Sequence, residues 1–233
     1  MRRTSVFFAS AALALAAGSA SAVPLFDFVL SENGLPVYSA FANPGSWTSA
    51  PIGGGAFLIQ GSYASGTVSF DYQLTLKSDP FATANFNLTN TSGALGLYST
   101  SLTLAVTPVA APSSYQGSIS GSIGDDPATS NGALLSAAPA LYEALVDGGV
   151  FQVMYPAPFA LAEPFGGLTA DLPALNFAGA GGPAVANSIG LRSSFTLTNG
   201  DSVGLVTRFD IVPTPGAASM LAVAGLVGLR RRR

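Results

Sequence analysis

The chain has 233 residues, of which 48% are hydrophobic and 9% charged, and its formal net charge is −3. It contains neither cysteine nor histidine. This double absence excludes disulfides, Ser–His–Asp and Cys–His nucleophilic systems and zinc sites built on His or Cys, which leaves carboxylate chemistry, oxygen-ligand metal sites and binding without catalysis.

The first 22 residues have the three parts of a secretory signal peptide. Arg2 and Arg3 form a charged region, Val6–Ala17 is apolar, and Ala20-Ser21-Ala22 is a site of alternating small residues. This order predicts export through the secretion translocon and cleavage after Ala22. An N-terminal membrane anchor is the alternative, which the short apolar region disfavours.

The body of the chain, residues 23–211, is dominated by alternation of apolar and polar residues. The pattern is clearest in Gly66–Lys77 and Ala82–Thr89, with an Asp79-Pro80 turn signal between them. Shorter alternating or apolar runs follow at Leu102–Val106 and Val150–Tyr155. A period of two is typical of half-buried strands, so we expect a strand at each run.

The last alternating run of the body is interrupted by Asn199-Gly200. Apolar residues alternate from Ile189 to Leu197 before this dipeptide and from Val203 to Ile211 after it. Asn-Gly favours two-residue turns with positive φ, and the sequence therefore predicts a β-hairpin here.

One segment, Pro139–Asp147, departs from the alternation. Pro139 suits the first turn of a helix, Leu141 and Leu145 would share a face, and Gly148 would end the element. We therefore expect one short helix inside an otherwise all-β body, which forms a single antiparallel β-sandwich of jelly-roll-like type over residues 23–211.

The body is strongly acidic. All 12 Asp and Glu lie in it, but of the nine Lys and Arg only Lys77, Arg192 and Arg208 do, so its net charge is 3 − 12 = −9. Nucleic-acid binders need clustered cations, and this function class is therefore excluded.

Oxygen ligands for calcium are concentrated in one loop. Asp125-Asp126, Ser130 and Asn131 all lie within Gly124–Gly132. These are hard ligands of the kind that calcium prefers, although their spacing is not that of an EF-hand. An acidic, solvated turn is the alternative explanation.

Two other pairs of acids are candidates for carboxylate catalysis. Glu143 and Asp147 are four residues apart and would share one face of the expected helix, and Glu163 and Asp171 flank a Pro/Gly-rich loop. A glycosidase needs two carboxylates across a cleft, whereas two acids on one helical face are more often solvated.

Two further features have a functional and a structural interpretation. Trp47, the only tryptophan, follows Asn43-Pro44-Gly45 and would either stack on a sugar or pack in the core. Asn87-Leu88-Thr89 and Asn90-Thr91-Ser92 match the N-glycan acceptor pattern, but we do not expect them to be modified.

The C-terminal segment, residues 212–233, again has three parts. Val212-Pro213-Thr214-Pro215-Gly216 interrupts any regular element, residues 216–229 are apolar and uncharged, and Arg230, Arg231, Arg232 and Arg233 end the chain. As a helix, residues 216–229 would measure roughly 21 Å, short for a bilayer core of about 30 Å but able to cross it with local thinning. The arginines favour the cytoplasmic side. A buried C-terminal core helix is the alternative.

This order resembles the C-terminal sorting signal of PEP-CTERM proteins. The Pro-Glu-Pro of that family corresponds to Pro213-Thr214-Pro215, with Thr214 in place of Glu. The resemblance implies a Gram-negative, exopolysaccharide-producing source and processing by an exosortase, a membrane cysteine protease. A sortase signal has the same three-part order, but the chain lacks an LPxTG sequence. The resemblance covers only the tail.

From the sequence we expect an exported, non-catalytic cell-surface or extracellular-matrix protein. It would be held transiently in the inner membrane by residues 216–229 and processed near Pro213-Thr214-Pro215, with exopolysaccharide as a candidate partner. The alternatives are a carbohydrate- or calcium-binding β-sandwich and an exported enzyme acting on polysaccharide through carboxylates. We expect no cofactor.

Overall fold

The computed structural model describes residues 22–109, 113–129, 131–164 and 166–213. In this part of the chain the regular structure consists of strands, without a helix. The strands are β1 (Phe26–Glu32), β2 (Leu35–Ser39), β3 (Trp47–Gly53), β4 (Ala56–Ala64), β5 (Val68–Lys77), β6 (Phe81–Asn90), β7 (Gly96–Ala105), β8 (Ser113–Gly124), β9 (Ala133–Ala137), β10 (Ala140–Val146), β11 (Gly149–Pro156), β12 (Ala160–Glu163), β13 (Thr169–Gly182), β14 (Ser188–Leu197) and β15 (Ser202–Pro213).

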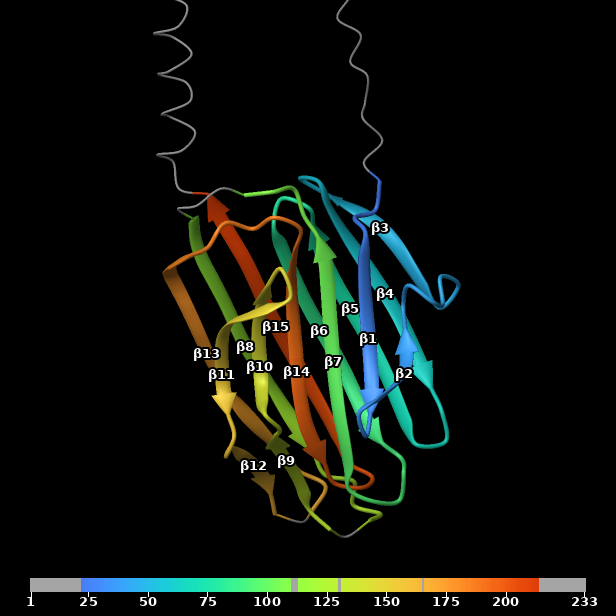
Figure 1. Cartoon of the computed structure of the whole chain (residues 1–233). Coiled ribbons are helices and arrows are strands. Elements are labelled where there is room, and N and C mark those ends of the chain that lie inside the picture. Colours follow the sequence, from blue (N-terminus) through green and yellow to red (C-terminus); the bar gives the residue numbers. More distant parts are fainter. Residues whose placement is uncertain (1–21, 110–112, 130, 165, 214–233) are drawn as a thin grey trace, which may run out of the picture.

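The strands form two sheets that pack face to face (Figure 1). One sheet has the order β11-β10-β14-β7-β1-β2. In the same sheet β9 also pairs with β14, and β12 pairs with β9. The second sheet has the order β13-β8-β15-β6-β5-β4-β3. Every pairing between these strands is antiparallel. The all-β fold and the antiparallel two-sheet architecture expected from the sequence are therefore confirmed.

The alternating runs form the expected strands. In β5 the apolar residues from Val68 to Leu76 are buried, while Asp71 and Gln73 between them are exposed. The β5–β6 hairpin turns at Ser78–Pro80, with Lys77 paired to Phe81, so the Asp79-Pro80 signal is also confirmed. Alternation marks these strands clearly because one face lies on the core and the other faces solvent.

The predicted helix at Pro139–Asp147 is wrong, because Ala140–Val146 forms strand β10. Asp147 and Gly148 have φ of 49° and 82°, and Val146 pairs with Gly149, so this Asp-Gly closes a two-residue hairpin to β11. Six of the seven β10 residues are buried, which removes the alternation. A short, mostly apolar run without alternation does not distinguish a helix from a strand that is buried on both faces.

The predicted hairpin at Asn199-Gly200 is also wrong. The flanking strands β14 and β15 belong to different sheets, and β15 pairs with β6 and β8 instead. Only Gly200 has positive φ, 82°, whereas the tight hairpin turn favoured by Asn-Gly needs positive φ at both central residues. The turn therefore leads the chain from one sheet to the other.

The core between the sheets is rich in aromatic residues. Phe28 of one sheet packs against Phe70 and Tyr72 of the other, with ring centroids 5.6 and 4.9 Å away. Tyr142 extends across the core and donates a hydrogen bond of 2.7 Å to the Arg208 carbonyl on β15. Burial raises the pKa of Tyr142 far above its ordinary value, so its hydroxyl stays protonated and remains a donor.

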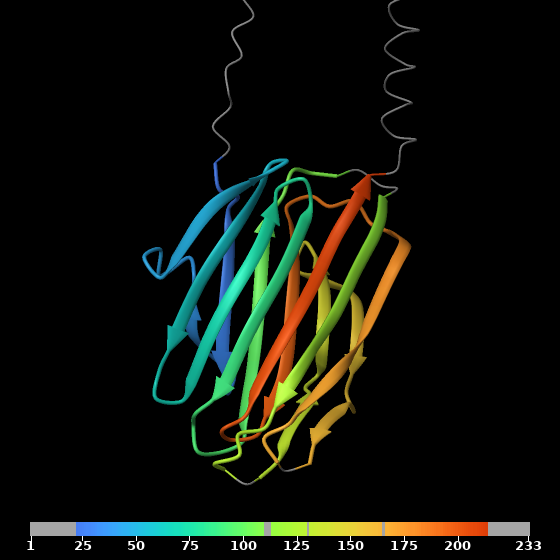
Figure 2. The ribbon, with the colours of Figure 1, turned by 180° about the vertical axis from the view of Figure 1, so that it is seen from behind.

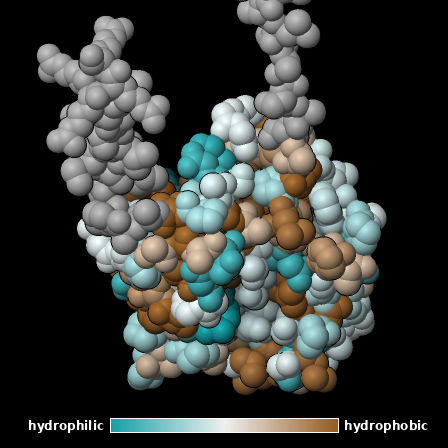
Figure 3. All heavy atoms as spheres, turned by 45° about the horizontal axis from the view of Figure 1, so that its top comes forward, coloured by the Kyte–Doolittle hydropathy of each residue, from teal (hydrophilic) through white to brown (hydrophobic). Residues whose placement is uncertain are grey.

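The first and last described residues, Ala22 and Pro213, lie at the same end of the sandwich (Figure 1). Figure 3 brings this end forward and shows apolar residues interspersed with polar ones, without one continuous apolar face. Strand β15 is paired up to Pro213, which lies opposite Ser113 of β8, two residues beyond the predicted body boundary at 211. The described body therefore includes Val212 and Pro213, the first two residues of the predicted processing motif.

Candidate functional site

Figure 2 shows the seven-stranded sheet from its outer side. On this face the exposed residues of β5 and β6 are polar. At its centre a shallow depression is lined by Asp71 and Gln73 of β5 and by Asn85 and Asn87 of β6. Gln60 of β4 lies directly opposite Gln73 and completes the set. We call these five residues the amide patch.

Strand register brings the amide patch together from three strands. Gln60 pairs with Gln73, and Gln73 in turn pairs with Asn85, so three amides form one row across the sheet. Asp71 pairs with Asn87 in the adjacent row. Paired Cβ atoms lie about 5 Å apart, and the backbone ladder fixes this spacing. The backbone therefore fixes the spacing at which the patch side chains leave the sheet.

The patch side chains make no hydrogen bonds within the described part of the chain, unlike most of the other amides. Asn90, the next inward residue after Leu88, is fully buried and donates to the carbonyls of Leu197 and Ala94 at 2.9 and 2.7 Å. Gln116 likewise donates to Asp210 at 2.9 Å. The amides of the patch thus retain their full capacity to donate and accept.

Gly204 on β15 makes room for one member of the patch. A Cβ atom at Gly204 would lie 2.8 Å from Oδ1 of Asn87, closer than such contacts occur. Gly204 is paired with Asn87 in the sheet register. The missing side chain therefore allows the Asn87 amide to lie over β15.

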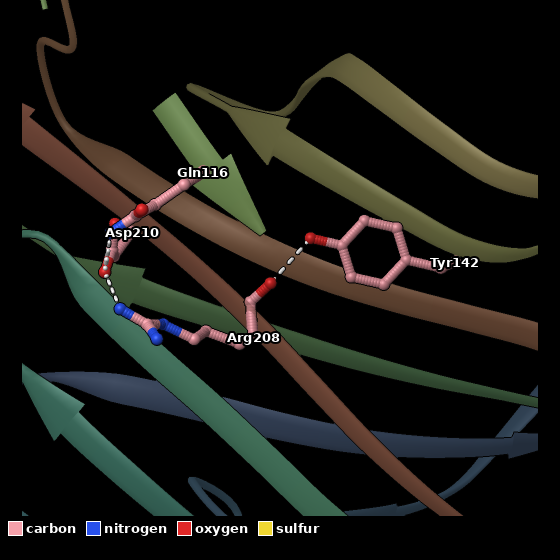
Figure 4. A network of polar contacts seen from close by, with 4 residues as sticks. All are labelled: Gln116, Tyr142, Arg208 and Asp210. Carbon is pink, nitrogen blue, oxygen red and sulfur yellow. Dashed lines mark hydrogen bonds and ion pairs between the residues drawn. The ribbon is translucent and has the colours of Figure 1, made fainter. Parts of the chain in front are cut away.

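All three cations of the described residues are paired with acids. Lys77 contacts Asp79 at 2.7 Å and Arg192 contacts Glu143 at 2.5 Å. Arg208 contacts Asp210, which also accepts from Gln116 (Figure 4). The positive charge of the body is therefore already neutralised locally.

The loop that carries the candidate calcium ligands uses most of their oxygens in hydrogen bonds to other residues of the protein. Asp125 accepts from the backbone of Gly166 and Gly167 at 3.0 and 2.8 Å, and Asp126 accepts from Ala128 at 2.9 Å. These backbone hydrogen bonds lower the pKa of Asp125. Asn131 accepts from Thr129 at 2.7 Å, and Ser130 lies outside the described residues.

A fully buried acid that the sequence analysis did not single out, Asp201, adds to this loop. It accepts from the Asp126 backbone at 3.0 Å and from the Thr198 hydroxyl. One oxygen of Asp125, Oδ1, is buried without a partner. Within the described residues no group of three or more His, Cys, Asp or Glu side chains is arranged to hold a metal ion.

Glu143 and Asp147, which were expected to share a helical face, lie apart in function: each has its own hydrogen-bonding partners. Glu143 is buried and paired with Arg192 across β10 and β14. Asp147 accepts from the backbone N–H groups of Ala186, Asn187 and Ser188 at 2.8, 2.7 and 2.9 Å. These bonds lower the pKa of Asp147 and join the β10–β11 turn to the segment before β14.

The remaining sequence candidates do not come together into one site. Glu163 ends β12 and Asp171 lies on β13, and neither forms an ion pair with a described residue. Trp47 is half-buried, donates from Nε1 to the Ala40 carbonyl at 2.9 Å and packs edge-on against Phe26. These contacts of Trp47 agree with the core-packing interpretation. Of the two glycan-acceptor asparagines, Asn87 is exposed and Asn90 is buried.

The predicted processing residues lie mostly outside the described chain. Ala22 is described and exposed, whereas Ala20 is outside. Val212 and Pro213 form the end of β15, and Thr214, Pro215, Gly216, the apolar residues 216–229 and Arg230–Arg233 are outside. Among the residues that are described, none belongs to a helix with the length and hydropathy needed to span a membrane.

No protein-family model matches the chain, and no curated protein is significantly similar to it in sequence.

Proposed function

We propose that this chain is an exported, non-catalytic cell-surface or extracellular-matrix protein that is sorted through its C-terminal segment. In this proposal the signal peptide directs secretion and is removed after Ala22. Residues 216–229 hold the protein in the inner membrane with Arg230–Arg233 inside, and an exosortase-type protease then cuts near Pro213-Thr214-Pro215.

The observation that supports this proposal most is where the body ends. The last described ladder pair is Pro213 with Ser113, within the processing motif, and the last buried apolar residue of β15 is Ile211. Removal of the residues after the processing motif therefore takes away no described strand and no described core residue. A cleavable sorting segment requires a body of this kind.

The test is intact-mass analysis of the protein made in a bacterium with an active exosortase and in a matched strain without one. We expect a product that begins at Val23 and ends near residues 213–215 only in the first strain. Replacing Arg230–Arg233 by Ser should reduce retention and processing, because each arginine at the membrane centre costs about 2.5–3.5 kcal/mol on the insertion scale.

A chain truncated after Pro213 is the control for export. It should leave the cell as soluble protein with the same N-terminus, whatever protease is present. A surface product that still ends in Arg233 at wild-type amounts, in the strain with the active exosortase, would contradict the processing step. A product that begins at Met1 would contradict export itself.

The jelly-roll-like subclass of the sandwich also remains a proposal. The calcium-binding alternative is weakened by the use of the Asp125 and Asp126 carboxylates as acceptors for backbone N–H groups. The carboxylate-enzyme alternative is weakened because Glu143 is paired with Arg192 and Asp147 with three backbone groups. Neither alternative is favoured by a specific observation.

A further inference from the structure

The amide patch has hydrogen-bonding capacity that the fold does not use. Gln60, Gln73, Asn85 and Asn87 each carry two N–H donors and one carbonyl acceptor, and none of these groups bonds to a described residue. Other polar side chains of the body, such as Asn90 and Asp147, are tied to the backbone at several points. The patch therefore has no role in holding the sheet together.

The composition of the patch indicates which ligand it suits. Amides donate and accept at the same point, which matches a hydroxyl group, itself both donor and acceptor. Asp71 adds an acceptor for a further hydroxyl. Several surrounding outward positions carry hydroxyl groups, among them Ser62, Thr75, Thr83 and Ser122, whereas the exposed Val206 of β15 lies opposite Asn85.

Charge argues for a neutral ligand. The body has a net charge of −9, Asp71 lies within the patch, and Lys77, Arg192 and Arg208 are each paired with an acid. A polyanion would meet repulsion without a free cation to bind it. A protein partner is also disfavoured, because protein interfaces are enriched in aromatic residues, Met and Arg at their centre and the patch has none of these.

We propose that the amide patch binds neutral polysaccharide, with the sugar chain lying across strands β4, β5 and β6. The rows of side chains run perpendicular to the strands, and neighbouring strands lie about 4.8 Å apart. Successive hydroxyl groups of one extended sugar chain therefore meet successive amides of one row. Binding needs no metal and no export.

The experiment uses the purified full chain in a polyoxyethylene detergent, which carries no sugar headgroup, with EDTA present. Affinity electrophoresis through gels containing dextran, galactomannan, hydroxyethyl cellulose, alginate or polygalacturonate screens for binding, and calorimetry then gives Kd for oligosaccharides of the polymer that binds. We expect retardation by at least one neutral polymer that the patch variants abolish. Alginate and polygalacturonate can bind the cations of Arg230–Arg233, so any retardation by them should be the same in the patch variants.

Substitutions in the amide patch test whether it is the binding site. Gln73→Ala with Asn85→Ala should raise Kd by about tenfold or more, because two hydrogen-bonding side chains are lost. Asn176→Ala is the matched control, since it removes an exposed amide from β13 of the same sheet, and it should leave Kd unchanged. Asp71→Asn should keep binding within about threefold, because the amide preserves an acceptor. Gly204→Ala should weaken binding without removing any amide, because it displaces Asn87.

Each variant is first shown to melt cooperatively, so that lost binding is not lost folding. Absence of retardation by every neutral polymer, loss of alginate or polygalacturonate binding in the patch variants, or equal effects of Asn176→Ala and the patch variants would each overturn the proposal. Self-association blocked by the patch variants would instead assign the face to a second copy. Since export is not involved, these outcomes leave the sorting proposal untouched.

Discussion

At the scale of single residues, aspartates take the place of disulfides in holding the loops. Asp27 accepts from Ser39 and Phe41, Asp125 from Gly166 and Gly167, and Asp147 from three successive backbone groups. Hydrogen bonds to ionised acceptors are stronger than neutral ones. In a chain without cysteine, these contacts fix loops that lie far apart in sequence.

Asp147 allows the most direct test of this role. We expect Asp147→Asn to lower the free energy of unfolding at neutral pH by about 1 kcal/mol, because an exposed amide replaces a charged acceptor of three hydrogen bonds. Asn tolerates the positive φ of this turn, so backbone strain is not added. Asp171→Asn, which removes the same charge from an exposed position, is the control and should change little.

The same carboxylates predict the response to acid. Backbone N–H groups hold the pKa of Asp147 and Asp125 below the ordinary value of 3.8. The stability that these groups contribute is therefore complete above pH 3.8 and is lost as the pH falls through their lower folded values. Melting curves from pH 6 downward should show a shallower acid loss for Asp147→Asn than for the wild type. Equal slopes would contradict the role of Asp147.

The sequence pattern shows which side chains face outward, but not which of them are neighbours on adjacent strands. The alternation in Gly66–Lys77 and Ala82–Thr89 correctly places Asp71, Gln73, Asn85 and Asn87 on the solvent face. Gln60 joins them only through the β4–β5 register. The contribution of Gly204 depends on the pairing of β15 with β6, more than a hundred residues away in sequence. Pairing over this distance leaves no local signal.

At the scale of elements, three similar dipeptides have different outcomes. Asn33-Gly34 and Asp147-Gly148 both adopt positive φ and close two-residue hairpins, whereas Asn199-Gly200 connects the two sheets. Local turn chemistry favours a reversal of direction in all three. Tertiary packing decides whether the strand after the turn pairs with the strand before it or joins the opposite sheet. The hairpin predicted at Asn199-Gly200 was therefore wrong.

Close contacts between glycine and large side chains also define how the strands fit. A Cβ atom at Gly117 of β8 would lie 2.5 Å from the Tyr142 hydroxyl, 2.6 Å from Phe177 and 2.8 Å from the Arg208 carbonyl. The Tyr142 hydroxyl is itself bonded to that carbonyl (Figure 4). Because Gly117 has no side chain, the Tyr142 hydroxyl of β10 has room to reach the Arg208 carbonyl of β15.

We expect Gly117→Ala to destabilise the fold by about 2–3 kcal/mol, since overpacking a rigid core forces side chains and backbone to move. The loss of the Tyr142 hydrogen bond would account for part of this. Gly181→Ala on β13 is the matched control, because a Cβ atom there meets nothing within 4 Å. Chemical denaturation of both variants provides the measurement, and equal midpoints would contradict the packing argument.

At the scale of the whole molecule, the open edges of the sheets bear on whether the protein assembles. The terminal strands of the two sheet paths are β2, β11, β3 and β13. Pro36, Pro51 and Pro173 lie in β2, β3 and β13, and register shifts occur in the pairing of all four strands. Proline removes a donor, and bulges twist an edge away from a second chain.

These features predict that the body, residues 23–213, is a monomer that folds without its tail. The edges are interrupted where a second copy would add a strand, and the net charge of −9 makes two copies repel each other. Light scattering coupled to size-exclusion chromatography should give the monomer mass over a wide concentration range, in EDTA and at moderate salt. Circular dichroism should show a β-rich protein with one cooperative melt.

A concentration-dependent dimer at moderate salt would mean that an edge or a face pairs despite its interruptions. A melt that is cooperative only with the tail attached would mean that residues after Pro213 belong to the folded unit, and the processing proposal would then lose its structural support.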